Sequence, residues 1–394
     1  MVLSRLIVFG LVVTLLRKCA IPNRFQKKRK ASIDFRFLIK KTMFRHFHEI
    51  TVGTPPQPVK VSFDIGSSSI IGVLEVNCSD FDPKINYTNY NTSICYKNEV
   101  TYDPAKSKTN KKTGLLCDSE CFGGPEIGEI MYDKFGIGNP NDKNYIALNE
   151  PLRFGSGRYT ALSMHPIVGV SVPTDKKPDS NLFVEAWKQG KLENPVYSIH
   201  YRRCETESCE QAGALVLGGM DTENCEPIPA AYQMRCNNET REMPQFGVHQ
   251  IQVVKADKTT HNILNKNEKM VHVELNTQVS LIGMPDAKVQ EVYKFLEAES
   301  IDNNEAAILP CDSEEFEFKL IILGQEITIH SRDILDTKNE YKERPGYCYL
   351  NMFGTDFPGS TGGKYLIGQG VLLQQCIFVD FKDSFIGFSP IKNL

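Results

Sequence analysis

Two polar turns of the 394-residue chain carry side chains that could take part in acid–base chemistry. The first, FDIGSSSIIG (63–72), holds the carboxyl of Asp64 among glycine and serine residues, and the second, ELNTQVSLIGMP (274–285), holds the amide of Asn276. A carboxyl can donate or accept a proton, whereas an amide has no proton to exchange near neutrality. Each turn is followed well downstream by two apolar residues and a glycine, at 167–169 and 366–368. The repeated arrangement predicts a duplicated lobe.

The elements that must position these turns are mostly short strands. Runs of about 5–8 residues alternate or stay apolar between Gly, Pro and Asn residues, which is typical of a mostly β protein. Few helices are expected; the clearest are 182–189 and 286–299, and the second starts after Pro285. The expected strands are 48–52, 59–65, 69–76, 214–219, 248–254, 269–275, 318–323, 326–331 and 376–381.

The charge is distributed unevenly along the chain. Residues 1–45 hold 12 Lys and Arg residues but a single acid, Asp34, so the remainder has 33 basic and 47 acidic residues and a net charge of −14. Such a body repels polyanions, which disfavours binding to nucleic acid or to an anionic membrane. A chain of this length can also bury two substantial cores. The sequence therefore predicts an acidic body of two lobes behind a basic N-terminal extension.

Features of the extension and the body favour the secretory route. The apolar run 6–16 suits the core of a signal peptide and is short for a membrane span, so we expect a signal peptide at 1–20. The basic stretch at 21–45 is then interpreted as a removable prosegment. Twelve cysteines are compatible with an oxidising compartment. Sequons for N-glycosylation start at Asn77, Asn86, Asn91 and Asn238.

The string HFHEITVGTPPQPVKVSFDIGSSS (46–69) resembles the entry to the pepsin-like aspartic peptidases. In that family an aromatic-rich strand and G-T-P-P-Q lead into F-D-T-G-S-S. The resemblance continues through Tyr102-Asp103-Pro104, WKQGKLENPVYSIHY (187–201), LVLGGMD (215–221) and YLIGQGVLLQQC (365–376), and it ends at IGFSP (386–390). It covers nearly everything after the prosegment. Cys225 after GGMDTEN and Cys376 after LLQQ are similar to cysteines of some invertebrate, particularly nematode, members.

The resemblance implies a mostly β, bilobal pepsin-like fold with a central cleft and an interlobe β-sheet. We expect the N-terminal lobe at 46–225 and the C-terminal lobe at 226–394. Members of this family use two carboxyls that face each other across the lobes, share one proton and exchange roles as general acid and base. Asp64 matches the first of these positions, and Gly66 and Ser67 match the residues after it.

The second catalytic position has lost its carboxyl. SLIGMP (280–285) matches the family's S-L-x-x-x-P, which places Asn276 where the second Asp belongs and Thr277 where a Thr is kept. Gln278 and Val279 replace the small residues that follow. Losing a general acid–base partner typically costs about 10²–10⁴-fold in rate. An Asp64–Asn276 pair can hold a water but cannot relay a proton, and Gln278 adds bulk to a turn that the family keeps narrow.

Two further departures surround the same cleft. Ile65 stands where the family has a Thr that grips the opposite turn. The flap, a hairpin that covers the family's cleft, matches 121–138 best, which puts Phe122 in place of the flap tyrosine and Gly123 beside it. FGSGRY (154–159) is the competing match, and its position close to HPIVGV (165–170) argues against it.

The cysteines fit the same framework. Cys311–Cys348 matches the disulfide of the family's C-terminal lobe, and Cys78–Cys95 matches its N-terminal loop. Cys225 and Cys376 lie on segments expected in the interlobe sheet and can pair there. Cys117–Cys121 and Cys204–Cys209 are local pairs of workable spacing, which leaves Cys236 over. The connectivity stays open at this stage, because sequence alone does not prove a pairing.

We therefore expect a secreted homologue of the pepsin-like aspartic peptidases that is proteolytically inactive and binds an extended peptide or protein in its cleft. The alternative is an active acid endopeptidase, in which Asp64 hydrolyses peptide bonds together with another group. The histidines show no metal-ligand spacing, and we expect no metal, no cofactor and no nucleic acid. The expected protein is a monomer without a stable membrane anchor. It is expected to be secreted or extracellular, or else to lie in a lysosome-like lumen.

Overall fold

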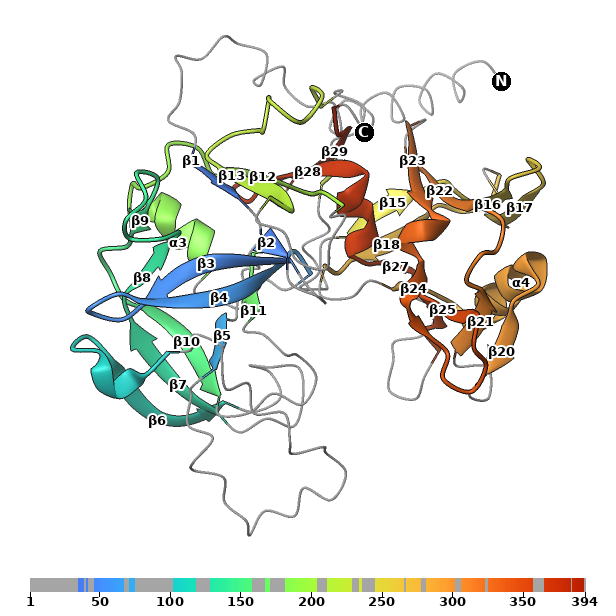
Figure 1. The fold of residues 1–394 in the computed structure, drawn as a ribbon. Coiled ribbons are helices and arrows are strands. Elements are labelled where there is room, and N and C mark those ends of the chain that lie inside the picture. Colours follow the sequence, from blue (N-terminus) through green and yellow to red (C-terminus); the bar gives the residue numbers. More distant parts are fainter. Residues whose placement is uncertain are drawn as a thin grey trace, which may run out of the picture.

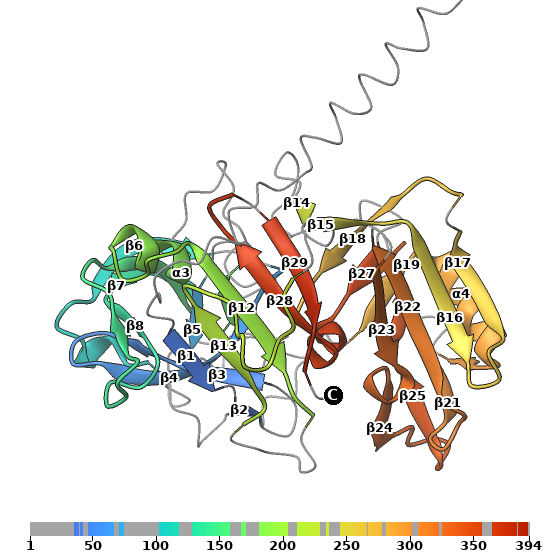
Figure 2. The ribbon, with the colours of Figure 1, turned by 90° about the horizontal axis from the view of Figure 1, so that it is seen from above.

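The protein is built from two β-rich lobes that lie side by side (Figure 1). The view from above shows strands of a shared sheet running between them (Figure 2). A computed structural model describes the following residues: 35–38, 40–41, 46–66, 71–74, 102–117, 128–157, 167–170, 181–203, 211–228, 234–235, 245–265, 267–277, 281–301, 306–322, 325–356, 365–383 and 385–392.

An antiparallel sheet of six strands joins the lobes. In spatial order its strands are β1 (Phe35–Leu38), β13 (Gly213–Leu217), β12 (Val196–Tyr201), β28 (Gln375–Asp380), β29 (Phe385–Pro390) and β14 (Met234–Arg235). Segments of both lobes meet where β12 pairs with β28. The edge strand β1 comes from the segment interpreted as a prosegment and pairs with residues 214–217.

A sheet of ten strands forms the N-terminal lobe. Its main path is β6 (Lys111–Cys117), β7 (Gly128–Asp133), β10 (Leu152–Gly157), β5 (Ile71–Leu74), β11 (Ile167–Gly169), β4 (Gln57–Asp64), β3 (His46–Val52), β8 (Phe135–Ile137) and β9 (Ile146–Ala147). The short strand β2 (Lys40–Lys41) pairs with β3.

Three smaller sheets form the C-terminal lobe. The first contains β15 (Gln245–Val248), β18 (Val271–Leu275), β27 (Tyr365–Ile367), β19 (Ile282–Met284) and β26 (Met352–Gly354). The second contains β17 (Thr260–Leu264), β16 (Gln250–Lys255), β22 (Phe316–Ile322) and β23 (Gln325–His330). The third contains β20 (Glu299–Ile301), β21 (Ala306–Pro310), β25 (Tyr347–Leu350) and β24 (Leu335–Glu340).

The described residues contain two α-helices and three short 3₁₀ turns. Helix α3 (Leu182–Lys188) is capped by the Asn181 side chain, and α4 (Asp286–Leu296) follows Pro285. The 3₁₀ turns are η3 (Pro104–Lys106), η6 (Ser331–Asp333) and η7 (Gln369–Leu373). These few helices on many strands agree with the mostly β, bilobal class expected from the sequence.

The two lobes repeat one local topology around the two polar turns. In the N-terminal lobe β11 lies between the strands that flank the first turn, parallel to β4 and antiparallel to β5. In the C-terminal lobe β27 lies in the same way between β18 and β19, parallel to the first and antiparallel to the second. The apolar-apolar-Gly units are these inserted strands. The sequence echo therefore corresponds to a repeated structural unit.

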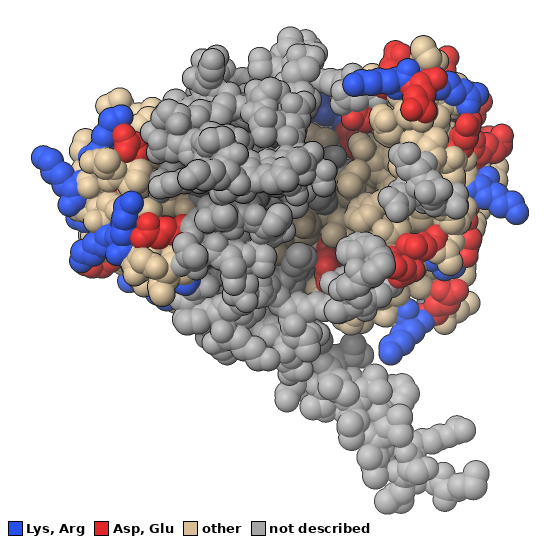
Figure 3. Space-filling model, turned by 90° about the horizontal axis from the view of Figure 1, so that it is seen from below, with Lys and Arg blue, Asp and Glu red and all other residues tan. Residues whose placement is uncertain are grey.

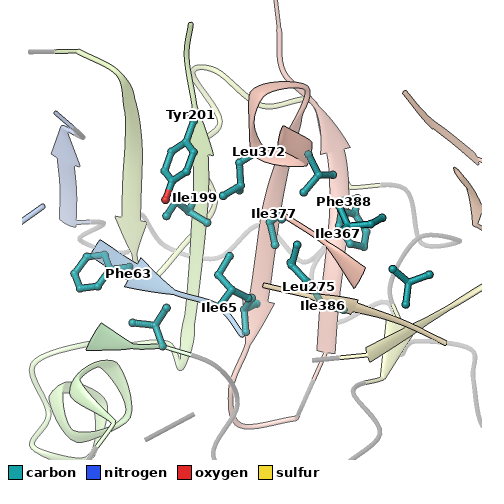
Figure 4. Packing of buried hydrophobic residues seen from close by; sticks show 14 of the residues in the cluster. Phe63, Ile65, Ile199, Tyr201, Leu275, Ile367, Leu372, Ile377, Ile386 and Phe388 are labelled. Atoms are coloured by element: carbon teal, nitrogen blue, oxygen red, sulfur yellow. The ribbon is translucent and has the colours of Figure 1, made fainter. Parts of the chain in front are cut away.

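One apolar core runs through both lobes and the sheet between them. Figure 4 shows its interlobe part, where Ile65 and Leu275 from the two turns lie over Ile377 and Ile386 of the shared sheet. On the surface, acidic and basic side chains of the described residues lie intermixed on both lobes in the view of Figure 3. The interior thus ties the lobes together through apolar contacts.

Two expected elements differ from the observed ones. The run 248–254, expected as one strand, is split at His249 between β15 and β16, which belong to different sheets. The helix expected to reach residue 299 ends at Leu296, because Glu297 adopts the left-handed conformation (φ 59°) and the Ala298 N–H returns to the Tyr293 carbonyl. A local cap therefore ends the helix, and pairing with two different sheets divides the strand.

Candidate functional site

Asp64 occupies the last position of β4, whose second half is buried. The strand is held on both sides, by β3 and by β11, so the position of its end is fixed by the sheet. The carboxyl is 5% exposed, and its Oδ1 accepts a hydrogen bond from the Gly66 N–H at 2.8 Å. The Gly66 N–H holds this oxygen in place on the turn.

Thr277, from the opposite lobe, hydrogen-bonds to the turn that carries Asp64. Its Oγ1 accepts the Ile65 N–H at 3.0 Å and donates to the Phe63 carbonyl at 3.1 Å. The same oxygen lies 3.3 Å from Asp64 Oδ1. Thr277 is buried, so these bonds are shielded from water. One side chain of the C-terminal lobe therefore fixes the backbone on both sides of the Asp64 carboxyl.

Ile65 replaces the corresponding hydroxyl on the N-terminal side. Its side chain is 1% exposed and points into the apolar layer between the two turns and the shared sheet (Figure 4). Leu275 belongs to the same layer. An aliphatic side chain here adds apolar burial and forms no hydrogen bond to the opposite turn. The contact between the lobes at these turns is therefore made by the Thr277 hydroxyl and by apolar packing of Ile65.

The turns of Asp64 and Asn276 are in direct contact. A Cβ built on Gly66 would lie 3.1 Å from Asn276 Cα and 3.1 Å from the Leu275 carbonyl oxygen. Any residue larger than glycine would therefore push two backbones apart. The Asn276 N–H donates to the Ile367 carbonyl at 2.9 Å, which anchors this turn to β27. Asn276 is only partly buried.

Two buried titratable residues near these turns were not singled out in the sequence. Burial, together with the negative charge of Asp64, raises the pKa of the Tyr201 phenol well above its ordinary value. Tyr201 lies on β12 and is 3% exposed, so it stays neutral. Glu274, two residues before Asn276, is also buried and accepts a hydrogen bond from the Gln245 amide at 2.8 Å. Their placement depends on strand register, for which the sequence gives no signal.

The G-T-P-P-Q motif anchors the loop before β6. The Gln57 amide exchanges two hydrogen bonds of 2.9 Å with the backbone N–H and carbonyl of Asp103. The Thr54 N–H donates to Ser107 Oγ at 3.0 Å, and the Thr54 carbonyl accepts from the Lys108 N–H at 2.8 Å. The G-T-P-P-Q motif therefore packs directly against the segment that begins with Tyr102-Asp103-Pro104.

A buried hydrogen-bond network fixes the base of the β6–β7 pair. The Tyr102 hydroxyl donates to Asp133 Oδ2 at 2.5 Å, and Thr109 Oγ1 donates to Asp133 Oδ1 at 2.5 Å. Burial and the hydrogen bond to Asp133 raise the pKa of Tyr102 well above its ordinary value. Asn110 adds a bond of 2.9 Å to the Tyr102 oxygen. The segment that leads into β6 is thereby joined to the end of β7.

The two candidate flap segments lie in different contexts. Strands β6 and β7 form an antiparallel pair connected by 118–127. Residues 154–157, from the competing segment, lie within β10, which pairs with β7 on one side and β5 on the other. The described part of the competing segment is therefore a central strand and not a hairpin tip. Phe122 and Gly123 lie outside the described residues, and their flap role stays a prediction.

The structure contains two of the predicted disulfides, Cys225–Cys376 and Cys311–Cys348. Cys117 ends β6. Other predicted residues lie outside the part of the chain that the structure describes. These are Ser67, Gln278, Cys78, Cys95, Cys121, Cys204, Cys209, Asn77, Asn86, Asn91 and Asn238.

This arrangement can polarise a water but has one titratable group where a proton relay needs two. Asp64 keeps its backbone donor and its neighbouring hydroxyl. The facing turn offers the Asn276 amide, which can donate or accept a hydrogen bond and cannot exchange a proton near neutrality. The two turns therefore supply one carboxyl and one amide.

The chain is similar to known proteins over most of its length. The family model described as eukaryotic aspartyl protease matches residues 45–391. A probable vacuolar protease A of Trichophyton verrucosum is 23% identical over 354 residues, which cover 88% of this chain and 79% of the relative. Pepsin A of Bos taurus is 23% identical over 349 residues (88% and 84%), and aspartic protease 6 of Caenorhabditis elegans is 23% identical over 359 residues (88% and 82%). Among the described residues, no helix is long and apolar enough to span a membrane.

Proposed function

The chain belongs to the eukaryotic aspartyl protease family, and from this premise we propose that it is a proteolytically inactive member that binds an extended peptide or protein segment in its cleft. Asn276 carries the proposal. It lies on the turn that contacts Gly66, in the lobe opposite Asp64, where the reaction needs a second carboxyl. Extended segments bind to such clefts through strand-type hydrogen bonds and side-chain pockets, neither of which requires a proton relay.

The changes around the site support inactivity beyond one substitution. Ile65 packs in the interlobe core. The aliphatic side chain that stands where the family has a hydroxyl is therefore part of a stable packing arrangement. Gln278, Val279 and Phe122 add sequence departures at positions that match the chemistry. The scaffold keeps its inserted strands, its Gly66 contact and the Thr277 grip. Because the fold around the cleft is kept while the second carboxyl is replaced, these features support binding as the retained activity.

An active acid endopeptidase is the second candidate. It is favoured by the intact hydrogen bonding of Asp64, which keeps Gly66 and Thr277 within reach of its Oδ1. This candidate requires another group to replace the second carboxyl, or deamidation of Asn276 to an acid. The two candidates differ in whether peptide bonds are broken.

We also propose that the chain is secreted or enters a lysosome-like lumen as a monomer, with a signal peptide at 1–20 and a prosegment at 21–45. The disulfides Cys225–Cys376 and Cys311–Cys348 support an oxidising compartment. Relatives of similar length are named as vacuolar proteases and pepsins. The lobes proposed at 46–225 and 226–394 meet at the β12–β28 pair. We further propose that the chain is similar to nematode members of the family in its Cys225 and Cys376.

The test combines a cleavage assay with a binding assay on the secreted protein. Acid-denatured haemoglobin labelled with a rhodamine, whose emission does not change at pH 3–5, reports binding by anisotropy, and mass spectrometry of the same sample reports cleavage. We expect binding without cleavage. The Asp64→Ala variant is the matched control: cleavage by the wild type that this variant abolishes overturns inactivity. A wild type that neither binds nor cleaves overturns the binding proposal.

A further inference from the structure

A cluster of nucleophilic and titratable side chains lies in the shared sheet, apart from the two polar turns. The antiparallel register that pairs Ile199 with Ile377 places His200 of β12 next to Cys376 of β28. Cys376 pairs in turn with Ser389 of β29. The partner of Cys376 in its disulfide is Cys225, which follows β13 in the chain. Side chains from three adjacent strands and one loop therefore meet in one place.

The ligating atoms of this cluster are close and buried. A ring nitrogen of His200 and the Sγ atoms of Cys225 and Cys376 all lie within 4.8 Å of one another. Each of the three residues is 1% exposed. The Ser389 hydroxyl, across from Cys376, is buried and has no hydrogen-bond partner among the residues that the structure describes. It leaves a polar oxygen in an apolar setting, which normally has a cost.

An anchored carboxylate accompanies the imidazole. Asp221 Oδ2 lies 3.6 Å from His200 Nδ1. Its Oδ1 accepts the backbone N–H groups of Glu223 and Asn224, and Oδ2 accepts the Asn224 amide at 2.8 Å. Carboxylates placed in this way orient the histidine ligands of metal sites. Asp221 is thus tied to the loop that carries Cys225 and lies beside the imidazole.

Two thiolates and an imidazole form a donor set that suits zinc. Zn–S and Zn–N bonds of about 2.3 and 2.0 Å put tetrahedral ligand atoms about 3.5–3.8 Å apart. Atoms that already lie within 4.8 Å need small shifts to reach that spacing, once the sulfurs separate. The ligands are 25 and 151 residues apart in sequence, so no short motif reveals them. Strand register brings them together.

We propose that His200, Cys225 and Cys376 form a redox-gated site for zinc or a similar thiolate-binding divalent cation. The oxidised chain holds the disulfide. Exchange with a dithiol breaks the S–S bond, gives two protein thiols and oxidises the dithiol to its own disulfide. The cation then displaces the two thiol protons and is held by two thiolates and the imidazole. The same ligands are present in the newly made chain before oxidation.

The position of the cluster gives the cation a route of entry. Cys225, Cys376 and Ile391 form a small apolar group, with Met220 against it, that is separate from the main core. The end of the chain covers the group: Ile391 bridges to Cys225, and the Lys392 N–H donates to the Asn224 carbonyl at 2.6 Å. Opening this last segment exposes the site without unfolding either lobe.

The experiment titrates the full chain with Co²⁺ after reduction by a phosphine, which does not compete as a thiol ligand. A thiolate-to-cobalt charge-transfer band reports metal bound to sulfur. We expect the reduced wild type to bind one equivalent more than the Cys225→Ser/Cys376→Ser variant. The His200→Asn variant should bind that equivalent about 10–100-fold more weakly. The Cys311→Ser/Cys348→Ser variant is the matched control and should retain the full signal.

Thermal unfolding separates a folded site from thiols of an unfolded chain. Zinc that binds the native state raises the unfolding midpoint, whereas zinc that binds unfolded cysteines lowers it. We expect Zn²⁺ to raise the midpoint of the reduced wild type and not that of the Cys225→Ser/Cys376→Ser variant. Equal cobalt uptake by these two proteins overturns the proposal. So does an unchanged or lowered midpoint, or a reduced wild type that shows no cooperative transition with zinc.

Discussion

At the scale of single residues, the contact between the lobes depends strongly on Thr277. Its hydroxyl uses both its acceptor and its donor capacity on the turn of Asp64. In place of a matching hydroxyl, Ile65 contributes packing. Mutation of Ile65 and mutation of Thr277 should therefore destabilise the protein for different reasons. A smaller residue at 65 loses packing, whereas loss of the Thr277 hydroxyl leaves a buried N–H unpaired.

The Thr277→Val variant tests the polar half of the grip. Valine keeps the shape but leaves the Ile65 N–H and the Phe63 carbonyl without their partner. We expect a loss of about 1–3 kcal/mol in the free energy of unfolding, measured in urea, because both groups are buried. Thr277→Ser keeps the hydroxyl and should lose less than half of that amount. Equal losses in the two variants would show that the hydroxyl contributes no more to stability than the methyl group that serine lacks.

Asp380 gives the shared sheet a pH dependence. Burial raises the pKa of this carboxyl above its ordinary value of 3.8, although its Oδ1 accepts the N–H groups of Lys382 and Asp383. The native state therefore binds the proton more tightly than the unfolded chain. The contribution of Asp380 to stability is complete below pH 3.8 and is lost as the pH rises through the raised pKa.

The Asp380→Asn variant checks this dependence. Asparagine keeps an oxygen acceptor for the two N–H groups and has no charge to desolvate. We expect the wild type to gain stability relative to the variant as the pH falls from 7 to 4, in urea unfolding at each pH. A constant difference between the two proteins over this range would contradict the raised pKa.

At the scale of elements, the β6–β7 pair depends on a polar network at its base. Asp133 is 0% exposed, and its two oxygens accept the hydroxyls of Tyr102 and Thr109. Because a buried carboxylate needs its donors, removal of one hydroxyl costs more than the bond itself. The network ties the strand pair to the segment that Gln57 anchors through Asp103.

The Tyr102→Phe variant removes one donor and keeps the ring in the core. We expect a loss of about 1.5–3 kcal/mol in the free energy of unfolding, since the lost bond is to a charged group. Amide hydrogen exchange should rise in β6 and β7 more than in β22 and β23 of the other lobe. Uniform exchange across both lobes would show that the network does not act on the strand pair in particular.

The sequence predicted those elements whose pattern is local. Motif strings located the turns of Asp64 and Asn276, and the apolar-apolar-Gly units located β11 and β27. The break at His249 was missed although the apolar positions change phase there, from Val248 to Ile251, and the His249 N–H donates to the Ile321 carbonyl of the next sheet. Strand β1 was missed because its basic surroundings read as a prosegment.

The site was predictable to the same extent. Asp64 and Asn276 follow from aligned motifs, whereas the positions of Tyr201 and His200 depend on the pairing of β12 with β28. These strands lie far apart in the chain, and no local pattern fixes their register. Inter-strand neighbours are set by the hydrophobic faces of whole sheets, which short strings do not encode.

At the scale of the whole molecule, an ion pair between Arg203 and Asp333 joins the lobes beside the shared sheet. Arg203, just after β12, donates from Nε to Asp333 Oδ1 at 2.9 Å and from a second nitrogen to Oδ2. The Gln374 amide adds a bond of 3.0 Å to Oδ2. The Asp333 side chain is 3% exposed and that of Arg203 is 31% exposed, so a buried carboxylate depends on a partly exposed cation.

The Arg203→Ala variant tests whether this pair couples the lobes. The Asp333 carboxylate would keep only the Gln374 bond among those described here, and we expect a loss of about 1–3 kcal/mol, reduced from the cost at a fully buried pair. Trp187, the single tryptophan of the chain, lies in α3 and packs edge-on against Phe381, just after β28, with ring centroids 6.2 Å apart. Its fluorescence therefore reports the packing of α3 on the shared sheet, while far-ultraviolet circular dichroism reports both lobes. The two signals should coincide during urea unfolding of the wild type and separate in the variant, because weaker coupling lets the lobes unfold independently. Arg203→Lys keeps the positive charge but cannot donate to both Asp333 oxygens in the same geometry. Its loss of stability should therefore lie between those of the wild type and Arg203→Ala. Coincident signals in Arg203→Ala, at an unchanged midpoint, would show that the apolar core and the shared sheet couple the lobes without this pair.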